Sequence, residues 1–128
     1  MQIHQSAEDY LETILMLNQR MGRVRSIDVV NELGYTKASV SIAMKKLREN
    51  GYIAVDGEGN LTLLEPGREI AERIYSRHRL LTHFFVQLGV DEEVAAEDAC
   101  KAEHILSEQT LEKIREYALL HDAQYSVK

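Results

Sequence analysis

Residues 26–51, SIDVVNELGYTKASVSIAMKKLRENG, decide the fold that we expect for this chain. Ser26 and Thr36 each stand where a hydroxyl can cap a helix, the first over residues 27–33 and the second from 37 to about 50. A glycine between the two segments favours a tight turn, and another follows the second helix, where a left-handed residue commonly ends one. Two short helices joined by a tight turn are the helix-turn-helix pattern.

The second of these helices has two different faces. Its apolar face points to the core through Val40, Leu47 and either Ala43 or Met44. The opposite stripe carries basic and hydroxyl side chains, which can neutralise phosphates and meet base edges. We therefore expect DNA contacts from Arg25, Ser26, Thr36, Lys37, Ser39, Ser41, Lys45 and Lys46.

A β-hairpin is predicted directly after the helix-turn-helix. Residues 52–55 and 61–64 have strand character, and the Gly-rich residues 56–60 between them favour a turn. This order is that of a winged helix-turn-helix and favours DNA binding, the alternative being a motif used only for packing. Short hydroxyl side chains discriminate bases poorly, so we expect specificity to need DNA shape and a dimer on two half-sites.

Length and charge narrow the class of protein. The 128 residues suit one domain or two small ones, and the net charge of −6 argues against indiscriminate coating of nucleic acid. Residues 20–51 carry seven basic against three acidic side chains, whereas residues 65–128 carry eight against thirteen. A single cysteine, no signal peptide and no apolar run long enough for a membrane span predict a cytoplasmic protein.

The first predicted helix, with Ser6 as its cap, extends to about Met21. Its apolar side chains recur at helical spacing, and Asp9 and Glu12 lie three residues apart on the flank of that stripe. Acids near the start of a helix are commonly explained by the helix dipole alone. The apolar stripe comprises Tyr10, Ile14, Leu17 and Met21, with Leu11 and Leu15 beside it.

The second half is predicted to be helical. Pro66 begins a long helix that ends near residue 88, and His78 falls on its inward, apolar stripe beside two arginines that we interpret as a solvated flank. Asp91 caps the next helix, Ser107 caps the last, and residues 121–128 are expected to be frayed. A lone inward histidine is usually a satisfied core residue.

Residues 91–127 contain neither glycine nor proline, so we interpret residues 98–104 as helical. Residues three and four apart share a face of a helix, so Cys100, Glu103 and His104 would direct a thiol, a carboxylate and an imidazole toward one point. These groups are ligands of first-row transition metals. The spacing alone is more commonly that of a solvated polar face.

Taken together, four separated segments resemble the metal-dependent repressors of the diphtheria toxin repressor and manganese transport regulator family. The resemblance extends from about residue 6 to residue 117. The segments are AEDYLE from Ala7, RHRLL from Arg77, LGVD from Leu88 and DACKAEHILS from Asp98, with the winged helix between the first two.

The resemblance implies a homodimeric, cytoplasmic repressor of metal-uptake genes that binds double-stranded operator DNA when loaded with Mn(II) or Fe(II). It implies a mainly α fold, with a winged helix-turn-helix domain over residues 1–64 and a helical metal-binding and dimerisation domain over 65–128. We expect no additional barrel-like domain of the kind that the iron branch often carries, because 128 residues cannot contain it. The implied metal ligands are Asp9, Glu12, His78, Cys100, Glu103 and His104.

Departures from the two branches of that family leave the metal open. The manganese branch typically has a carboxylate where this chain has Cys100, whereas the iron branch typically has a thioether where this chain has Asp9. Thr82 and Ala96 stand where the iron branch carries a second set of ligands, so one ion or two remain as alternatives. A thiol could also admit Co(II) or Zn(II).

Other classes of function compete with this interpretation. A winged-helix regulator that senses a small organic ligand is the first alternative, and a structural interaction module leaves the basic segment unexplained. A metalloenzyme is a further alternative, because carboxylate and imidazole ligands can also support hydrolysis. We expect no enzymatic activity, because no catalytic base or substrate-binding loop accompanies the ligands.

Overall fold

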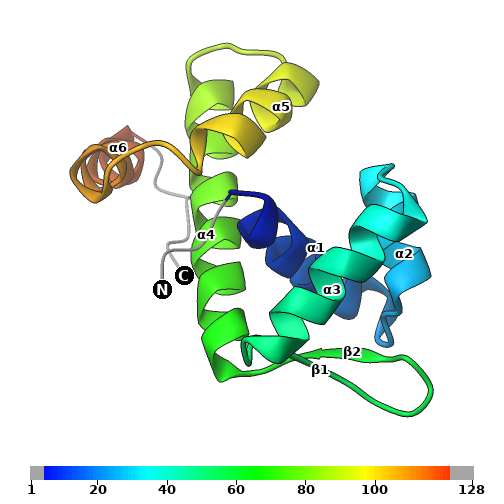
Figure 1. Ribbon diagram of the computed structural model, residues 1–128. Helices are drawn as coiled ribbons and strands as arrows, with labels where there is room; N and C mark the ends of the chain where they lie inside the picture. The colour runs from blue at the N-terminus through cyan, green and yellow to red at the C-terminus, as the bar shows by residue number, and fades with distance from the viewer. Residues whose placement is uncertain (1–4, 122–128) are drawn as a thin grey trace. The chain divides into compact units, whose positions relative to one another are not determined.

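The computed structural model describes residues 5–121 and divides the chain into two compact units, one up to Arg73 and one from Ile74 onward. The elements follow in the order α1 (Gln5–Met21), α2 (Ser26–Leu33), α3 (Lys37–Glu49), β1 (Ile53–Val55), β2 (Leu61–Leu63), α4 (Glu65–Gln87), α5 (Glu92–Ala102) and α6 (Glu108–His121) (Figure 1). The mainly α fold with a winged helix-turn-helix is confirmed. No barrel-like domain occurs within the described residues.

The first unit is the winged helix-turn-helix. Helix α1 packs against α2 and β2, and α3 packs against α2 and β1 (Figure 1). Gly34 ends α2 with a φ of 72°, a left-handed conformation that glycine adopts without strain. Thr36 then caps α3 by accepting a hydrogen bond from the Ser39 amide at 3.1 Å, as predicted.

The wing is a short antiparallel hairpin in which Ile53 pairs with Leu63 and Val55 with Leu61. Its turn is held by Asp56, whose carboxylate accepts hydrogen bonds from the side chain and backbone amide of Asn60 and from the Glu58 amide. These bonds, the Asn60 side chain first, hold the pKa of the Asp56 carboxyl below its usual range.

The core of the first unit follows most of the predicted apolar pattern. Leu11, Ile14, Leu15 and Leu17 of α1 are buried, as are Val40, Met44 and Leu47 of α3. Four expectations are wrong. The N-cap of α2 is Arg25 and not Ser26, which is the first residue of the helix. Ser6 lies inside α1, and Met21 is 50% exposed because it ends the helix beside Gly22. The helical spacing of Ile27, Val30 and Leu33 predicts that Ile27 is buried, but it is 43% exposed, because α2 turns Val29 into the core instead.

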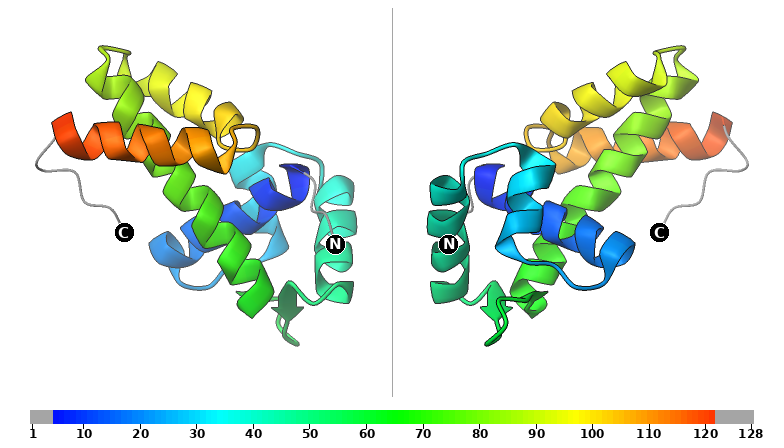
Figure 2. Two further views of the ribbon diagram at one scale, coloured as in Figure 1. Left: turned by 90° about the vertical axis from the view of Figure 1, so that its left-hand side faces the viewer. Right: turned by 90° about the vertical axis from the view of Figure 1, so that its right-hand side faces the viewer.

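The second unit packs α5 and α6 against the C-terminal part of α4 (Figure 2). Its core contains Leu80 and Leu81 of α4, Ala99 of α5, and Leu111 and Ala118 of α6. Ser107 caps α6 as predicted, by accepting a hydrogen bond from the Thr110 amide at 3.2 Å. His121 still belongs to α6, so the predicted fraying is wrong there, and the rest of that segment lies outside the described residues.

Gly67 offers a sharp test of packing in the first unit. A Cβ at this position would lie 2.2 Å from the Tyr52 carbonyl oxygen, so the first turn of α4 meets the base of the wing without room for a methyl group. We expect Gly67→Ala to lower the free energy of unfolding by about 1–3 kcal/mol, despite the better helix propensity of alanine. Urea unfolding followed by circular dichroism measures this difference.

Gly57→Ala is the matched control, because a Cβ at Gly57 meets no atom within 4 Å and its φ is not positive. Its unfolding midpoint should equal that of the unchanged protein. An unchanged midpoint for Gly67→Ala would contradict this account of the packing.

Candidate metal centre and DNA-reading surface

The predicted DNA-contacting residues fall on the outside of the first unit. Lys37, Ser39, Ser41, Lys45 and Lys46 are exposed on α3, whose opposite side is buried. The Thr36 hydroxyl donates a hydrogen bond to Ser39 Oγ at 2.9 Å, so both hydroxyls take part in the helix cap. Their capacity to read bases is correspondingly smaller than their number suggests.

Arg25 and Ser26 lie at the start of α2. The Arg25 amide donates a hydrogen bond to Asp28 Oδ2 at 2.9 Å, and Arg25 forms an isolated β-bridge with Asn60 of the wing turn. The Arg25 guanidinium also lies close to Gly59, within 3.6 Å of where a Cβ would be. Arg25 is exposed, and its side chain lies next to the turn of the wing. Ser26 is half-buried.

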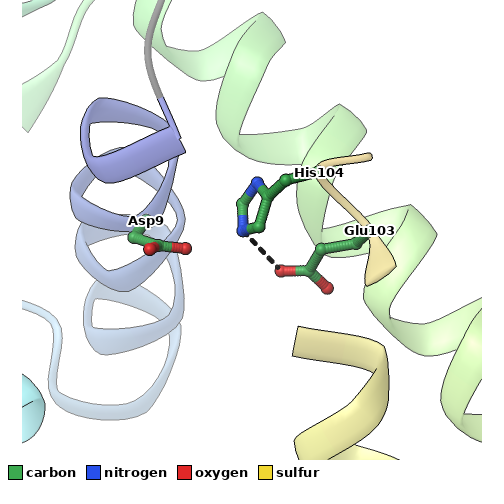
Figure 3. Close-up of side chains that lie close together, drawn as sticks. All are labelled: Asp9, Glu103 and His104. Carbon is green, nitrogen blue, oxygen red and sulfur yellow. Dashed lines mark ion pairs between the residues drawn. The ribbon is translucent and has the colours of Figure 1, made fainter. Parts of the chain in front are cut away.

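Glu103 is the most deeply buried carboxylate in the described part of the second unit. It is 0% exposed, and its Oε2 lies 2.9 Å from Nδ1 of His78 on α4. Its Oε1 lies 3.5 Å from Nε2 of His104, the pair joined by the dashed line in Figure 3. Within residues 5–121 that Oε1 accepts no hydrogen bond. Two imidazoles therefore bracket one buried carboxylate.

The backbone at Glu103 differs from the expected helix. Helix α5 ends at Ala102, and Glu103 is its C-cap, with its amide donating to the Ala99 carbonyl at 2.9 Å. His104 lies in the turn that follows, and its side chain is 1% exposed. The expectation of one continuous helical face through residues 100–104 is therefore wrong. Cys100 lies on α5 and is exposed, whereas the side chains of Glu103 and His104 are buried.

Asp9 and Glu12 both lie on α1 in the first unit, one turn apart, and Asp9 is labelled in Figure 3. Glu12 is only 6% exposed and Asp9 is half-buried. Burial of a carboxylate is costly unless other groups compensate its charge. The helix dipole, which acts on exposed acids of the first turn, does not account for a carboxylate buried in the second turn.

Arg77 is a residue whose role the sequence analysis missed. We interpreted it as a solvated flank, but its side chain is 13% exposed. It donates a hydrogen bond to the Glu103 carbonyl oxygen at 3.2 Å and forms an ion pair with Glu108 in the first turn of α6. Arg79, by contrast, is exposed over the Tyr75 ring, as expected of a flank.

These contacts give Arg77 a structural task at the site. The carbonyl groups at the end of a helix lack partners within the helix, and a guanidinium satisfies one of them. Arg77 thereby ties the end of α5 and the start of α6 to α4 and fixes the turn that carries Glu103 and His104. The sequence indicates this role of Arg77 only weakly, through its position next to His78.

The donor chemistry fits a first-row divalent cation. Carboxylates suit Mn(II), imidazoles suit iron, zinc and related ions, and a thiol adds a softer donor. The six predicted ligands supply three carboxylates, two imidazoles and one thiol, of which His78, Glu103 and His104 are brought together within the second unit.

Two models of one protein family together match almost the whole chain. Residues 2–61 match the model of the iron dependent repressor N-terminal DNA binding domain, and residues 64–120 match that of the iron dependent repressor metal binding and dimerisation domain. The transcriptional regulator MntR of Escherichia coli O157:H7 is 32% identical over 117 residues, which cover 91% of this chain and 76% of the relative.

A second relative and a solved structure are also similar to this chain, and both are transcriptional regulators. The regulator MntR of Bacillus subtilis strain 168 is 35% identical over 109 residues, covering 85% of this chain and 77% of its own. A manganese-dependent transcriptional repressor solved in complex with manganese is 28% identical, with a TM-score of 0.79. That match covers 87% of this chain but 51% of the solved chain, so this chain spans about half of that protein.

Replacement of Arg77 tests the description of the α5–α6 turn. We expect Arg77→Ala to lower the free energy of unfolding by about 1–3 kcal/mol, because the buried Glu103 carbonyl loses a charge-assisted hydrogen bond. Hydrogen exchange measured by NMR should become faster at the amides of Glu103, Ile105 and Leu106, which are hydrogen-bonded within this turn. Arg79→Ala is the control and should leave these amides protected. Equal exchange in both variants would contradict the role of Arg77.

Proposed function

Because this chain belongs to the iron-dependent repressor family, we propose that six of its side chains hold at least one divalent cation that controls its affinity for operator DNA. The chain is a metal-responsive, DNA-binding transcriptional regulator, with a DNA-binding domain followed by a metal-binding and dimerisation domain. We place the boundary between these two domains at residues 64 and 65.

The buried carboxylate of Glu103 is the observation that carries the metal site. A buried carboxylate with one oxygen against each of two imidazoles is well placed to bind a cation, and Oε1 has no hydrogen bond that a cation would have to displace. We propose that Asp9 and Glu12 of the first unit complete the site with His78, Cys100, Glu103 and His104 of the second.

This ligand set would connect the two units of the chain. A bound divalent cation would supply the positive charge that offsets repulsion among the three carboxylates. Asp9 and Glu12 belong to the unit that reads DNA and the other four ligands to the dimerisation unit, so shared binding would restrict their relative motion. The spacing of the two α3 helices in a dimer would then be held near one turn of DNA, about 34 Å.

The DNA side of the mechanism uses the exposed residues of the first unit. We propose that Arg25, Lys37, Lys45 and Lys46 bind phosphates, which makes the affinity depend on salt concentration. The hydroxyls of Ser26, Thr36, Ser39 and Ser41 would contact the neighbouring DNA phosphates and the base edges. The coupling between cation and DNA is reciprocal, so operator DNA must raise the affinity for the cation by the same factor.

The nature of the cation follows from the ligands and the relatives. A solved repressor that resembles this chain is described as manganese-dependent, and carboxylate-rich sites suit that ion, so we propose Mn(II) or Fe(II) as the cofactor. Metal-uptake genes are the targets that a repressor loaded with its own nutrient metal would control. A small organic effector is the alternative, and it would leave operator binding unaffected by a chelator.

The remaining assignments follow from the same function. A homodimer acting on operator DNA works where the genome is, so we place this regulator in the cytoplasm. Within residues 5–121 the structure contains no helix that is both long and apolar enough to cross a bilayer. We assign the chain no catalytic role, because the proposed ligands serve to connect its two units.

Glu103→Gln tests the metal site directly. It keeps the size of the side chain and removes its charge, so the variant should remain a folded dimer. With an operator selected from random duplexes, Mn(II) tightens binding of the unchanged protein, commonly by about 5- to 150-fold in coupled systems. That gain should be lost in Glu103→Gln, as measured by fluorescence anisotropy with Mn(II), Fe(II), Co(II), Zn(II) or a chelator.

Glu97→Gln provides the matched control, because Glu97 is an exposed carboxylate on the same helix α5. It should retain the full response to Mn(II). If Mn(II) strengthened operator binding by Glu103→Gln as much as by Glu97→Gln, Glu103 would not be a ligand.

Cys100 can be tested separately, because it is the only cysteine of the chain. A thiolate bound to Co(II) gives a sulfur-to-metal charge-transfer band in the ultraviolet, and any such band must come from Cys100. We expect this band with the unchanged protein and its loss in Cys100→Ser, with the Co(II) affinity reduced but not abolished. Tight Co(II) binding without the band would remove Cys100 from the ligand set.

A further inference from the structure

Ile42 stands out on the DNA-reading helix. It is 58% exposed, more than any other large apolar side chain in the described part of the first unit. Val40 and Met44, two residues before and after it, are buried. At about 100° per residue these side chains point about 160° away from Ile42, so Ile42 faces outward from the middle of α3.

The surroundings of Ile42 are basic and hydroxyl-bearing. Ser39 precedes it by three residues, and Lys45 and Lys46 follow it by three and four, so all share its face of the helix. A single exposed apolar residue is ordinary on a protein surface. What distinguishes Ile42 is that Ser39, Lys45 and Lys46 on its face are suited to phosphates, which would bring this face of α3 against a duplex.

We propose that Ile42 determines sequence specificity by contacting the 5-methyl group of a thymine in the major groove of each operator half-site. This inference rests on the DNA-reading role of α3 given above. The thymine methyl is the apolar group that the major groove presents, and apolar side chains are its usual partners. Ile42 has no donor or acceptor, so it cannot take any of the polar base contacts.

The polar side chains near Ile42 are poorly suited to discriminate between bases. Thr36 and Ser39 are hydrogen-bonded to each other in the cap of α3, and hydroxyls accept or donate to several bases without strong preference. Lysines on the same face bind phosphates of any sequence. A β-branched side chain on a helix has essentially one favoured χ1 rotamer, so Ile42 presents its methyl groups in a fixed direction.

Deoxyuridine substitution tests the contact, because it removes only the thymine methyl group. An operator is first selected from random duplexes with the unchanged protein and Mn(II), and each selected thymine is then replaced singly by deoxyuridine. Burial of one methyl group corresponds to about fourfold in affinity. We therefore expect about a fourfold loss at one thymine position in each half-site, measured by fluorescence anisotropy.

Ile42→Ala should bind the thymine and deoxyuridine forms of that position equally. Because Ile42 is exposed, this variant should fold normally, which circular dichroism checks. Ile27→Ala is the matched control: Ile27 is an isoleucine of the same unit that is 43% exposed on α2, and its replacement should keep the fourfold difference.

The outcomes separate the inference from the function on which it rests. Metal-dependent selection of an operator with no deoxyuridine effect, or an effect that survives in Ile42→Ala, would overturn the role of Ile42 and leave the regulator intact. Failure of the unchanged protein to select any sequence with Mn(II) would overturn both.

Discussion

The carboxylate of Glu103 is the group on which the architecture of the second unit depends. A fully buried carboxylate is costly unless its charge is compensated, and here one imidazole faces each of its oxygens. Arg77 fixes the adjoining backbone by donating to the Glu103 carbonyl and pairing with Glu108. Three helices therefore meet at one short turn, and the proposed ligands Glu103 and His104 are held in place by backbone contacts as well as by side-chain contacts.

Basic and acidic side chains are distributed unevenly along the chain. The first unit carries the basic segment and presents it on α3 beside a wing whose turn is held by hydrogen bonds to Asp56. The second unit is acidic and contains the buried Glu103. A chain with an overall negative charge can still bind DNA, because local charge on the reading helix, and not the net charge, meets the phosphates.

We propose that affinity and specificity are separated on α3. The lysines would give affinity for any duplex, whereas the hydroxyls of Thr36 and Ser39 are hydrogen-bonded in the helix cap. Sequence discrimination therefore falls to groups with a narrower choice of partner, and an outward isoleucine with one favoured χ1 rotamer is such a group. The proposed metal site would act on a different quantity, namely how well the two reading helices of a dimer fit two half-sites together.

The sequence alone determined what depends on local chemistry: the caps at Thr36 and Ser107, the buried face of α3, and the four segments that mark the family. The tertiary structure decided the rest. Helical spacing could not fix the rotation of a helix as short as α2, so it favoured Ile27 over Val29 for the core. It could not foresee that α5 ends at Ala102 or that Arg77 turns inward, because both depend on contacts between helices far apart in the chain. Local propensity acts over a few residues, whereas a helix end or an inward charge is stabilised by whichever distant groups can satisfy it.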